Sequence, residues 1–483
     1  MSNSSVASNL KNGFFWNSLS QFASQGMALL SMMVLGRLLN PEDFGVLGMF
    51  AIFIVIANMI VDSGMGASLI IKADVSAKDY STLFLYNLII SMLLYLILFF
   101  TAPVIANFYK TDILIQLIRV VALLIIIHAF SIVQNIRILK EMKFKALAII
   151  NFISAFISLI ISIIFATKGY GIWSLVIQQI SMALCTTVLM CCYNRFIPSI
   201  VFSIKSFKEQ FAFGINLMLS NFLQILTNNV TSNVMAKITT LNQTGYFVQS
   251  NKLTGSVNQI VTVVIDRTIF PVFAKIDDTE KIKQAYINLR KNIFSIFFPL
   301  YVLLALLSKP ILRILFGAKW IDAAWMLNIL AFSLIPLTIQ MLCRNILKSR
   351  GNTKQIFYNE IIKSILLILS IVTGMFLGIK YFLWSIVVSQ SIACLWIMYS
   401  VSKEIQYNYW QYLSSTLILV GISLFSYYCT AFIMNNIHID NPVLSFLFGI
   451  ALILLFVLLL SYALKQKEIF NLIRKVVNTK INK

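Results

Sequence analysis

The stretch Leu35–Phe50, LGRLLNPEDFGVLGMF, places a charged turn that contains proline between two long apolar runs. A related pattern returns two hundred residues later in Ala236–Ser250, which reads AKITTLNQTGYFVQS. In both copies a basic residue stands eight positions before a glycine: Arg37 before Gly45, and Lys237 before Gly245. Asn, Pro and Gly favour turns, so each stretch is predicted to be a short turn between two helices, with its glycine supplying turn geometry. The duplication predicts an internal repeat.

The composition places this repeat in a membrane. The chain has 483 residues, of which 59% are hydrophobic and 11% charged, and its mean hydropathy is +0.87. Apolar stretches of about 18 residues or more indicate helices that cross the bilayer. Fourteen such stretches are centred near residues 25, 53, 93, 125, 157, 181, 224, 258, 300, 335, 368, 391, 422 and 453. We therefore predict an all-α polytopic membrane protein with about fourteen transmembrane helices.

Several other protein classes are disfavoured by the residues present. The connections between apolar stretches are short, which leaves no room for an independent soluble domain. The six Cys show no CxxC spacing, and the two His are far apart, so neither a disulfide framework nor a metal centre is predicted. The sequence contains no GxxxxGK[ST] motif for ATP. We expect no cofactor and no enzymatic activity.

The net charge of +21 is explained by membrane orientation rather than by nucleic-acid binding. With the N-terminus in the cytoplasm, 26 Lys and Arg fall on the cytoplasmic side, nine on the other side and three inside helices. Cytoplasmic loops of membrane proteins carry such an excess. Both termini are therefore predicted to be cytoplasmic, and no nucleic-acid partner is expected.

Further matches extend the repeat along the chain. GIWSLV at residues 171–176 echoes FLWSIV at 382–387, and the offsets between matched segments drift only from 200 to 211. An even number of helices in each copy gives a parallel repeat around a central cleft. The predicted parts are a cytoplasmic tail at 1–12, a six-helix lobe at 13–200, a second six-helix lobe at 205–402, an extra helix pair at 410–464 and a basic tail at 465–483.

Polar stripes run along the helix that opens each lobe. Their members are Asn17, Gln21, Ser24 and Ser31 in the first helix, and Asn216, Ser220, Gln224, Asn228 and Thr231 in the seventh. Helical spacing puts each set on one face. Amides are costly in contact with hydrocarbon, so these faces must meet protein or water. Two interpretations stay open: hydrogen bonds between helices, or the lining of a cleft that binds a sugar-like cargo.

Ionisable residues inside apolar helices are a stronger sign of function. The eighth helix carries Lys252, Gln259 and Asp266 on one face, with Arg267 beside Asp266. In the eleventh helix Glu360 and Lys363 are three residues apart and able to pair. Arg267 and Glu360 also fit side chains that reach the cytoplasmic interface. A basic, amide-rich cleft suits an anionic cargo with a polar body.

Four segments resemble those of one known family. LGRLLNPEDFGVLGMF, GYGIWSLVIQQ, FPVFAKIDD and FGAKWIDAAWMLNILA occur in the order found in bacterial polysaccharide flippases of the multidrug/oligosaccharidyl-lipid/polysaccharide exporter superfamily. The resemblance covers about residues 13–400 and is strongest to the lipopolysaccharide, colanic acid and teichuronic acid exporter branch.

This resemblance implies a two-lobed flippase of the inner membrane. The cargo would be an undecaprenyl-pyrophosphate-linked oligosaccharide, and a polysaccharide polymerase and a chain-length regulator are implied as possible partners. Lys252 matches a basic residue of the family's eighth helix, whereas Thr231 stands where members often have Asp. A drug or cation antiporter of the same superfamily is the nearer alternative, and a membrane-embedded polymerase or ligase is the other.

The predicted orientation can be tested by cysteine labelling in intact spheroplasts. We expect an impermeant maleimide to label a cysteine at Asn242 and not one at Glu280, because the first position is placed outside and the second in the cytoplasm. Labelling after cell lysis controls for reactivity. Protection at position 242 together with reaction at 280 would overturn both the orientation and the parallel repeat.

Overall fold

The computed structural model describes residues 21, 23–72, 74–273, 276, 278–437, 439 and 441–464; some side chains of helices α9 and α10 and that of residue 353 lie outside this description. Within these ranges the secondary structure is helical and no strand occurs. Residues 23–38 form a helix before α2. The all-α fold class predicted from the sequence is confirmed.

The remaining helices follow in chain order. In the first half they are α2 Pro41–Asp62, α3 Met65–Ile71, α4 Ala77–Tyr109, α5 Ile113–Val121, α6 Leu123–Lys140, α7 Phe144–Thr167, α8 Ile172–Asn194, α9 Ile204–Ile238 and α10 Leu241–Phe273. In the second half they are α11 Thr279–Leu306, α12 Ser308–Phe316, the 3₁₀-helix η1 Ala318–Ala323, α13 Ala324–Ser349, α14 Thr353–Leu377, α15 Ile379–Glu404, α16 Tyr409–Asn436 and α17 Pro442–Ala463.

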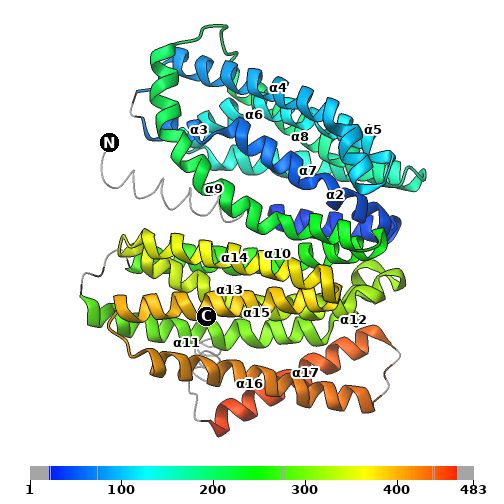
Figure 1. Cartoon of the computed structure of the whole chain (residues 1–483), viewed down its shortest axis with the longest axis vertical. Helices are drawn as coiled ribbons and strands as arrows, with labels where there is room; N and C mark the ends of the chain where they lie inside the picture. Colours follow the sequence, from blue (N-terminus) through cyan, green and yellow to red (C-terminus); the bar gives the residue numbers. More distant parts are fainter. Residues whose placement is uncertain are drawn as a thin grey trace, which may run out of the picture. The chain divides into compact units, whose positions relative to one another are not determined.

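The chain folds into two units, Met1–Gly245 and Tyr246–Lys483, which we call unit 1 and unit 2. In unit 1 the long helices run side by side, and α9 packs against α2, α3 and α4 (Figure 1). In unit 2 helix α13 contacts α11, α14 and α15, while α16 and α17 pack on α11 and α12. The sequence-based lobes at 13–200 and 205–402 and the helix pair at 410–464 stay predictions, and the tails at 1–12 and 465–483 lie outside the described residues.

Of the described helices, eleven are long and apolar enough to cross a membrane. They coincide with eleven of the fourteen predicted stretches. The other three stretches fall on the helix at 23–38 and on α9 and α10, which are 35 and 33 residues long. At 1.5 Å per residue these two exceed the roughly 30 Å of the hydrocarbon core. All fourteen stretches are thus helical where described, and the count of fourteen crossings stays a prediction.

The acidic part of the opening stretch is the start of helix α2. Pro41 occupies its first turn, where a missing N–H costs nothing. The backbone N–H of Asn40 donates to Asp43 Oδ2 at 2.9 Å, so the carboxylate caps the helix end. Glu42 and Asp43 also place negative charge at the positive end of the helix dipole.

The glycines of the duplicated turns have a different role from the predicted one. Gly45 lies inside α2 and Gly245 inside α10, so neither supplies turn geometry. A Cβ on Gly45 would collide with the carbonyl oxygen of Leu241, and a Cβ on Gly245 would collide with that of Pro41. Helices α2 and α10 therefore cross at their first turns, where only glycine lets the backbones approach so closely. Beside this crossing Asn242 Nδ2 donates to Glu42 Oε1 at 3.0 Å.

A buried arginine forms hydrogen bonds between α11 and α16 in unit 2. Arg290 of α11 is fully buried and donates from Nη1 to the carbonyl oxygen of Tyr412 at 3.1 Å and from Nη2 to Ser415 Oγ at 2.8 Å. Its guanidinium also lies 4.7 Å from the centre of the Tyr412 ring. Neutral oxygen atoms and an aromatic ring thus stabilise the positive charge of the Arg290 guanidinium.

The glycine crossing predicts a position-specific effect of one methyl group. Gly245→Ala should destabilise the protein by about 1–3 kcal/mol, because α2 must move away from α10. Gly255→Ala is the matched control, since it lies on the same helix and a Cβ there has no neighbour within 4 Å. Thermal unfolding of the purified variants in detergent gives the comparison. Equal melting temperatures for the two variants would contradict the crossing.

Candidate functional site

Several residues that the sequence singled out lie outside the description. Asn17 is outside the described residues, and the side chains of Gln224, Asn228, Asp266 and Arg267 are not described although their backbones lie in α9 and α10. Gln21 is half-buried at the start of the described chain, and Arg37 is exposed near the end of the first helix. The two amide stripes therefore stay predictions. The other candidate residues whose side chains are described, Lys252, Gln259, Glu360 and Lys363, lie in unit 2.

Helix α10 presents Lys252 and Gln259 on an exposed face. Val261 and Ile265, by contrast, are fully buried. Lys252 is eleven positions after the start of α10 at Leu241, which corresponds to about 16 Å along the helix axis.

The pairing of Glu360 with Lys363 on α14 occurs as predicted, and a third charge joins it. Lys363 Nζ lies 3.4 Å from Glu360 Oε2, and Arg344 of α13 forms an ion pair with Glu360 Oε1. Lys363 is only 8% exposed, and the side chains of Glu360 and Arg344 are 19% and 22% exposed. One carboxylate is thus shared by two cations.

Arg344 was missed as a site residue because its position in the sequence is ambiguous. It lies five residues before the end of α13, where basic side chains usually face the cytoplasm. The charge count accordingly assigned it to a loop. Only the packing of α13 against α14 shows that its side chain turns toward Glu360.

Three amides surround these charges. Gln340 Nε2 of α13 donates to the carbonyl oxygen of Gln390 on α15 at 2.9 Å, and Asn359 Nδ2 of α14 donates to Gln340 Oε1 at 3.5 Å. Gln340 and Asn359 are at least 98% buried. Together with the ion triad they join three helices, and we call Gln340, Arg344, Asn359, Glu360, Lys363 and Gln390 the unit 2 polar cluster.

Helix α10 contacts the same part of α13. Thr262 Oγ1 lies 3.7 Å from the sulfur of Met341, the residue that follows Gln340. Thr262 is three residues beyond Gln259 on α10, and Met341 follows Gln340 on α13. Helix α10 therefore contacts α13 next to a member of the unit 2 polar cluster.

The chemistry of the unit 2 polar cluster favours an anion over a metal ion. Within the described ranges no three His, Cys, Asp or Glu side chains gather closely enough to hold a metal. The carboxylate of Glu360 already has two cationic partners. Guanidinium and ammonium groups bind phosphate oxygens, and amides bind hydroxyls, so the groups of this cluster suit an anionic, hydroxylated ligand.

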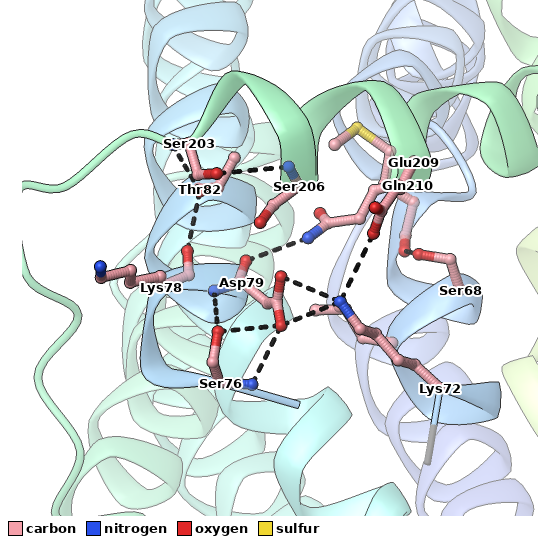
Figure 2. A network of polar contacts seen from close by, with 12 residues as sticks. Ser68, Lys72, Ser76, Lys78, Asp79, Thr82, Ser203, Ser206, Glu209 and Gln210 are labelled. Atoms are coloured by element: carbon pink, nitrogen blue, oxygen red, sulfur yellow. Dashed lines mark hydrogen bonds and ion pairs between the residues drawn. The ribbon is translucent and has the colours of Figure 1, made fainter. Parts of the chain in front are cut away.

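A second polar network lies in unit 1, where α9 starts against α4 (Figure 2). Lys72 Nζ is 3.2 Å from Asp79 Oδ2 and 3.6 Å from Glu209 Oε2, and Gln210 Nε2 donates to the carbonyl oxygen of Asp79 at 3.3 Å. The hydrogen bond from Lys72 to Asp79 raises the pKa of the lysine, so the charge of Lys72 is present below that pKa and is lost as the pH rises through it. With one cation and two carboxylates, this network does not suit an anionic cargo.

The chain has relatives of one kind among known sequences. A sequence profile described as polysaccharide biosynthesis protein matches residues 34–325. The chain is 24% identical to the teichuronic acid biosynthesis protein TuaB of Bacillus subtilis, which covers 73% of this chain and 74% of that protein. It is 26% identical to the succinoglycan biosynthesis transport protein ExoT of Rhizobium meliloti, and the alignment covers 72% of this chain and 71% of ExoT. It is 24% identical to the lipopolysaccharide biosynthesis protein WzxC of Escherichia coli, and the alignment covers 71% of this chain and 68% of WzxC.

Solved structures share the fold. The lipid II flippase MurJ in an inward closed conformation matches with a TM-score of 0.71 at 18% identity, covering 93% of this chain and 99% of that chain. An inward-facing multidrug resistance MATE family transporter matches with a TM-score of 0.60 at 18% identity. The match covers 79% of this chain and 94% of that transporter. Identities this low establish the common fold of these proteins and nothing finer.

The shared carboxylate predicts a strong charge effect on stability. Glu360→Gln should cost about 3–5 kcal/mol, because it leaves two cations together in a low-dielectric interior. Adding Lys363→Met should restore part of the lost stability by removing the extra charge.

Melting temperatures of the purified proteins in detergent test this expectation. Glu280→Gln is the control, since the exposed Glu280 makes a surface ion pair with Lys283 at 3.1 Å. A melting temperature for Glu360→Gln equal to that of the control would show that the carboxylate does not neutralise the triad.

Proposed function

Because the chain belongs to the polysaccharide biosynthesis protein family, we propose that it is a flippase for a lipid-linked oligosaccharide. The cargo would be an undecaprenyl-pyrophosphate-linked repeat unit, turned from the cytoplasmic to the outer leaflet of the inner membrane. The chain itself is a multi-pass membrane transporter and not an enzyme. The observation that carries the proposal is the unit 2 polar cluster, in which Arg344 and Lys363 both contact Glu360, together with the exposed Lys252 of α10.

The chemistry of the cargo matches this arrangement. A pyrophosphate carries concentrated negative charge, which ammonium and guanidinium groups bind well. Amides such as Gln259 on α10 supply donors and acceptors for sugar hydroxyls. In this proposal the cargo's head group crosses beside these polar faces, while its isoprenoid chain stays in the hydrocarbon, where it is soluble.

Transport would proceed by alternating access. In transporters built from parallel repeats, the substrate site lies at the interface of the repeats, and rocking of one repeat on the other exposes it to each side in turn. A ligand shifts such an equilibrium only by its different affinity for the two states. In this proposal Lys252, about 16 Å from the start of α10, contacts the pyrophosphate in both states.

The alternative of a drug or cation antiporter is less consistent with these charges. A cationic cargo requires carboxylates that are available to bind it. Within the described unit 2 polar cluster, Glu360 contributes the carboxylate, and both Arg344 and Lys363 already bind it. A polymerase and a chain-length regulator would act on the exported unit, and we propose them as partners in the same process.

The role of Lys252 gives the sharpest test of the proposed function. In cells that lack the native gene, Lys252→Gln should reduce polysaccharide export by about tenfold or more, because a charge-assisted bond to phosphate is lost. Lys252→Arg should keep more activity, since it retains the charge. Lys168→Gln removes an exposed lysine at the end of α7 and serves as the control.

Export is measured as surface polysaccharide, together with lipid-linked oligosaccharide retained on the cytoplasmic leaflet and protein present in the membrane. Equal loss of export by the Arg and Gln variants would argue for packing instead of charge. Normal export by Lys252→Gln would remove this residue from the transport path.

A further inference from the structure

A cavity of about 530 Å³ opens on unit 1 where α4, α6 and the end of α8 meet. We call it the α4–α8 groove. Phe84 of α4 and Phe130 of α6 form one wall, with ring centres 5.4 Å apart in an edge-to-face arrangement. Cys192 and the segment from Arg195 to Pro198 form the other side. Its size falls within the range of roughly 300–1,000 Å³ that is usual for ligand pockets.

Hydrogen bonds from α6 hold the rim of this groove in place. Gln134, which is 2% exposed, donates from Nε2 to the carbonyl oxygen of Phe196 at 2.9 Å. Asn194 Nδ2 in turn donates to Gln134 Oε1 at 2.9 Å. The guanidinium of Arg137 lies 4.2 Å from the centre of the Phe196 ring. The segment after α8 is therefore anchored, and the groove is a preformed feature of unit 1.

The groove lies near the start of α4 and the end of α8. Phe84 lies seven residues after the start of α4, and Cys191 three residues before the end of α8, which correspond to about 10 Å and 5 Å along the axes. Ile197 and Ile200 in the adjoining segment are each 90% exposed, and Phe130 is 42% exposed. In a membrane protein, apolar side chains this exposed suit contact with lipid.

The rim of the groove is cationic. Arg195 lines it and is exposed. Its backbone is left-handed, with φ of 48°, at the position after a helix where glycine is usual. One terminal nitrogen of Arg137 is buried and finds no hydrogen-bond acceptor among the described residues. None of the described residues that line the groove is acidic. Arginine on an apolar groove fits a phosphate that is joined to a hydrocarbon chain.

We propose that the α4–α8 groove binds one anionic phospholipid of the leaflet on this side. The phosphate lies on Arg195, and one acyl chain lies along Phe84, Phe130 and Ile197. A resident phospholipid is favoured over the isoprenoid carrier, because an anchored rim belongs to one leaflet and the carrier must follow its head group to the other. This inference concerns unit 1 alone and is independent of the cargo.

Bound lipid would also fix the segment that leads into α9. Ser199 donates from its N–H to Ser81 Oγ at 3.1 Å, and Ser203 does the same to Thr82 Oγ1 at 3.0 Å. The segment is therefore tied to α4 just beyond the groove. A ligand that binds only the folded state adds to its stability, so the lipid should act as a structural ligand of this connection.

Protection of Cys192 from alkylation tests the proposal with the full-length protein in detergent. Cys192 lines the groove and is exposed, whereas Cys429 lies on α16 of unit 2 and serves as the internal reference. N-ethylmaleimide labelling is followed by mass spectrometry of peptides, with fragment ions that separate Cys192 from Cys191. Phosphatidylglycerol at ten times its Kd should slow labelling of Cys192 by about tenfold and leave Cys429 unchanged.

Two variants and two other lipids decide the outcome. Arg195→Gln should weaken the protection by about tenfold, and Lys168→Gln, a charge-matched control at the end of α7, should not. Equal protection by phosphatidylethanolamine would overturn the recognition of an anionic head group. Stronger protection by undecaprenyl phosphate than by phosphatidylglycerol would assign the groove to the carrier and overturn the resident lipid. Full protection in Arg195→Gln would also overturn it.

Discussion

Hydrocarbon offers no hydrogen-bond partner, and the structure depends on that constraint. Backbone groups are satisfied within helices, and hydroxyl side chains follow the same rule. Thr82 donates to the carbonyl oxygen of Lys78 at 2.7 Å, and Ser158 donates to that of Ala155 at 2.9 Å. Groups that cannot be satisfied inside one helix must find a partner on another. The ion triad of α13 and α14 and the buried Arg290 of α11 are such cases, so the constraint that makes the fold helical also fixes which helices pack together.

The crossing of α2 and α10 shows how a repeat in sequence becomes a contact in space. Gly45 approaches Leu241, and Gly245 approaches Pro41, so each copy of the duplicated stretch offers the other the same surface. Glu42 and Asn242, which are also two hundred positions apart, bond across the crossing. A contact made by two like surfaces is self-complementary, as in twofold-symmetric dimers. Both glycines are needed for one close approach, which accounts for their matched positions better than two independent turns do.

The sequence predicted the helices and part of the site, and it failed where the decisive contact lies between distant segments. Hydropathy located the apolar stretches, and helical spacing identified Glu360 with Lys363, because both signals are local. Arg344 and the network of Lys72, Asp79 and Glu209 depend on which helices pack together, and the spacing of residues does not encode this. Local pattern also misassigned Gly45, since glycine serves turns and close helix contacts equally well. The break between α2 and α3, at Ser63 and Gly64 with positive φ, is likewise hidden inside a continuous apolar stretch.

Charge balance separates the polar groups that support the fold from those suited to bind a cargo. At the start of α9 two carboxylates surround Lys72, and the Asp79 carboxylate also caps α4 through Ser76. The unit 1 network therefore has one cation in contact with two carboxylates. In the unit 2 polar cluster the proportion is reversed, since the Glu360 carboxylate contacts both Arg344 and Lys363. All of these charges have an opposite charge in contact, so both networks can join helices. They differ in which sign predominates among the contacts, and only the cluster on α13 and α14 offers the guanidinium and ammonium groups that bind phosphate oxygens.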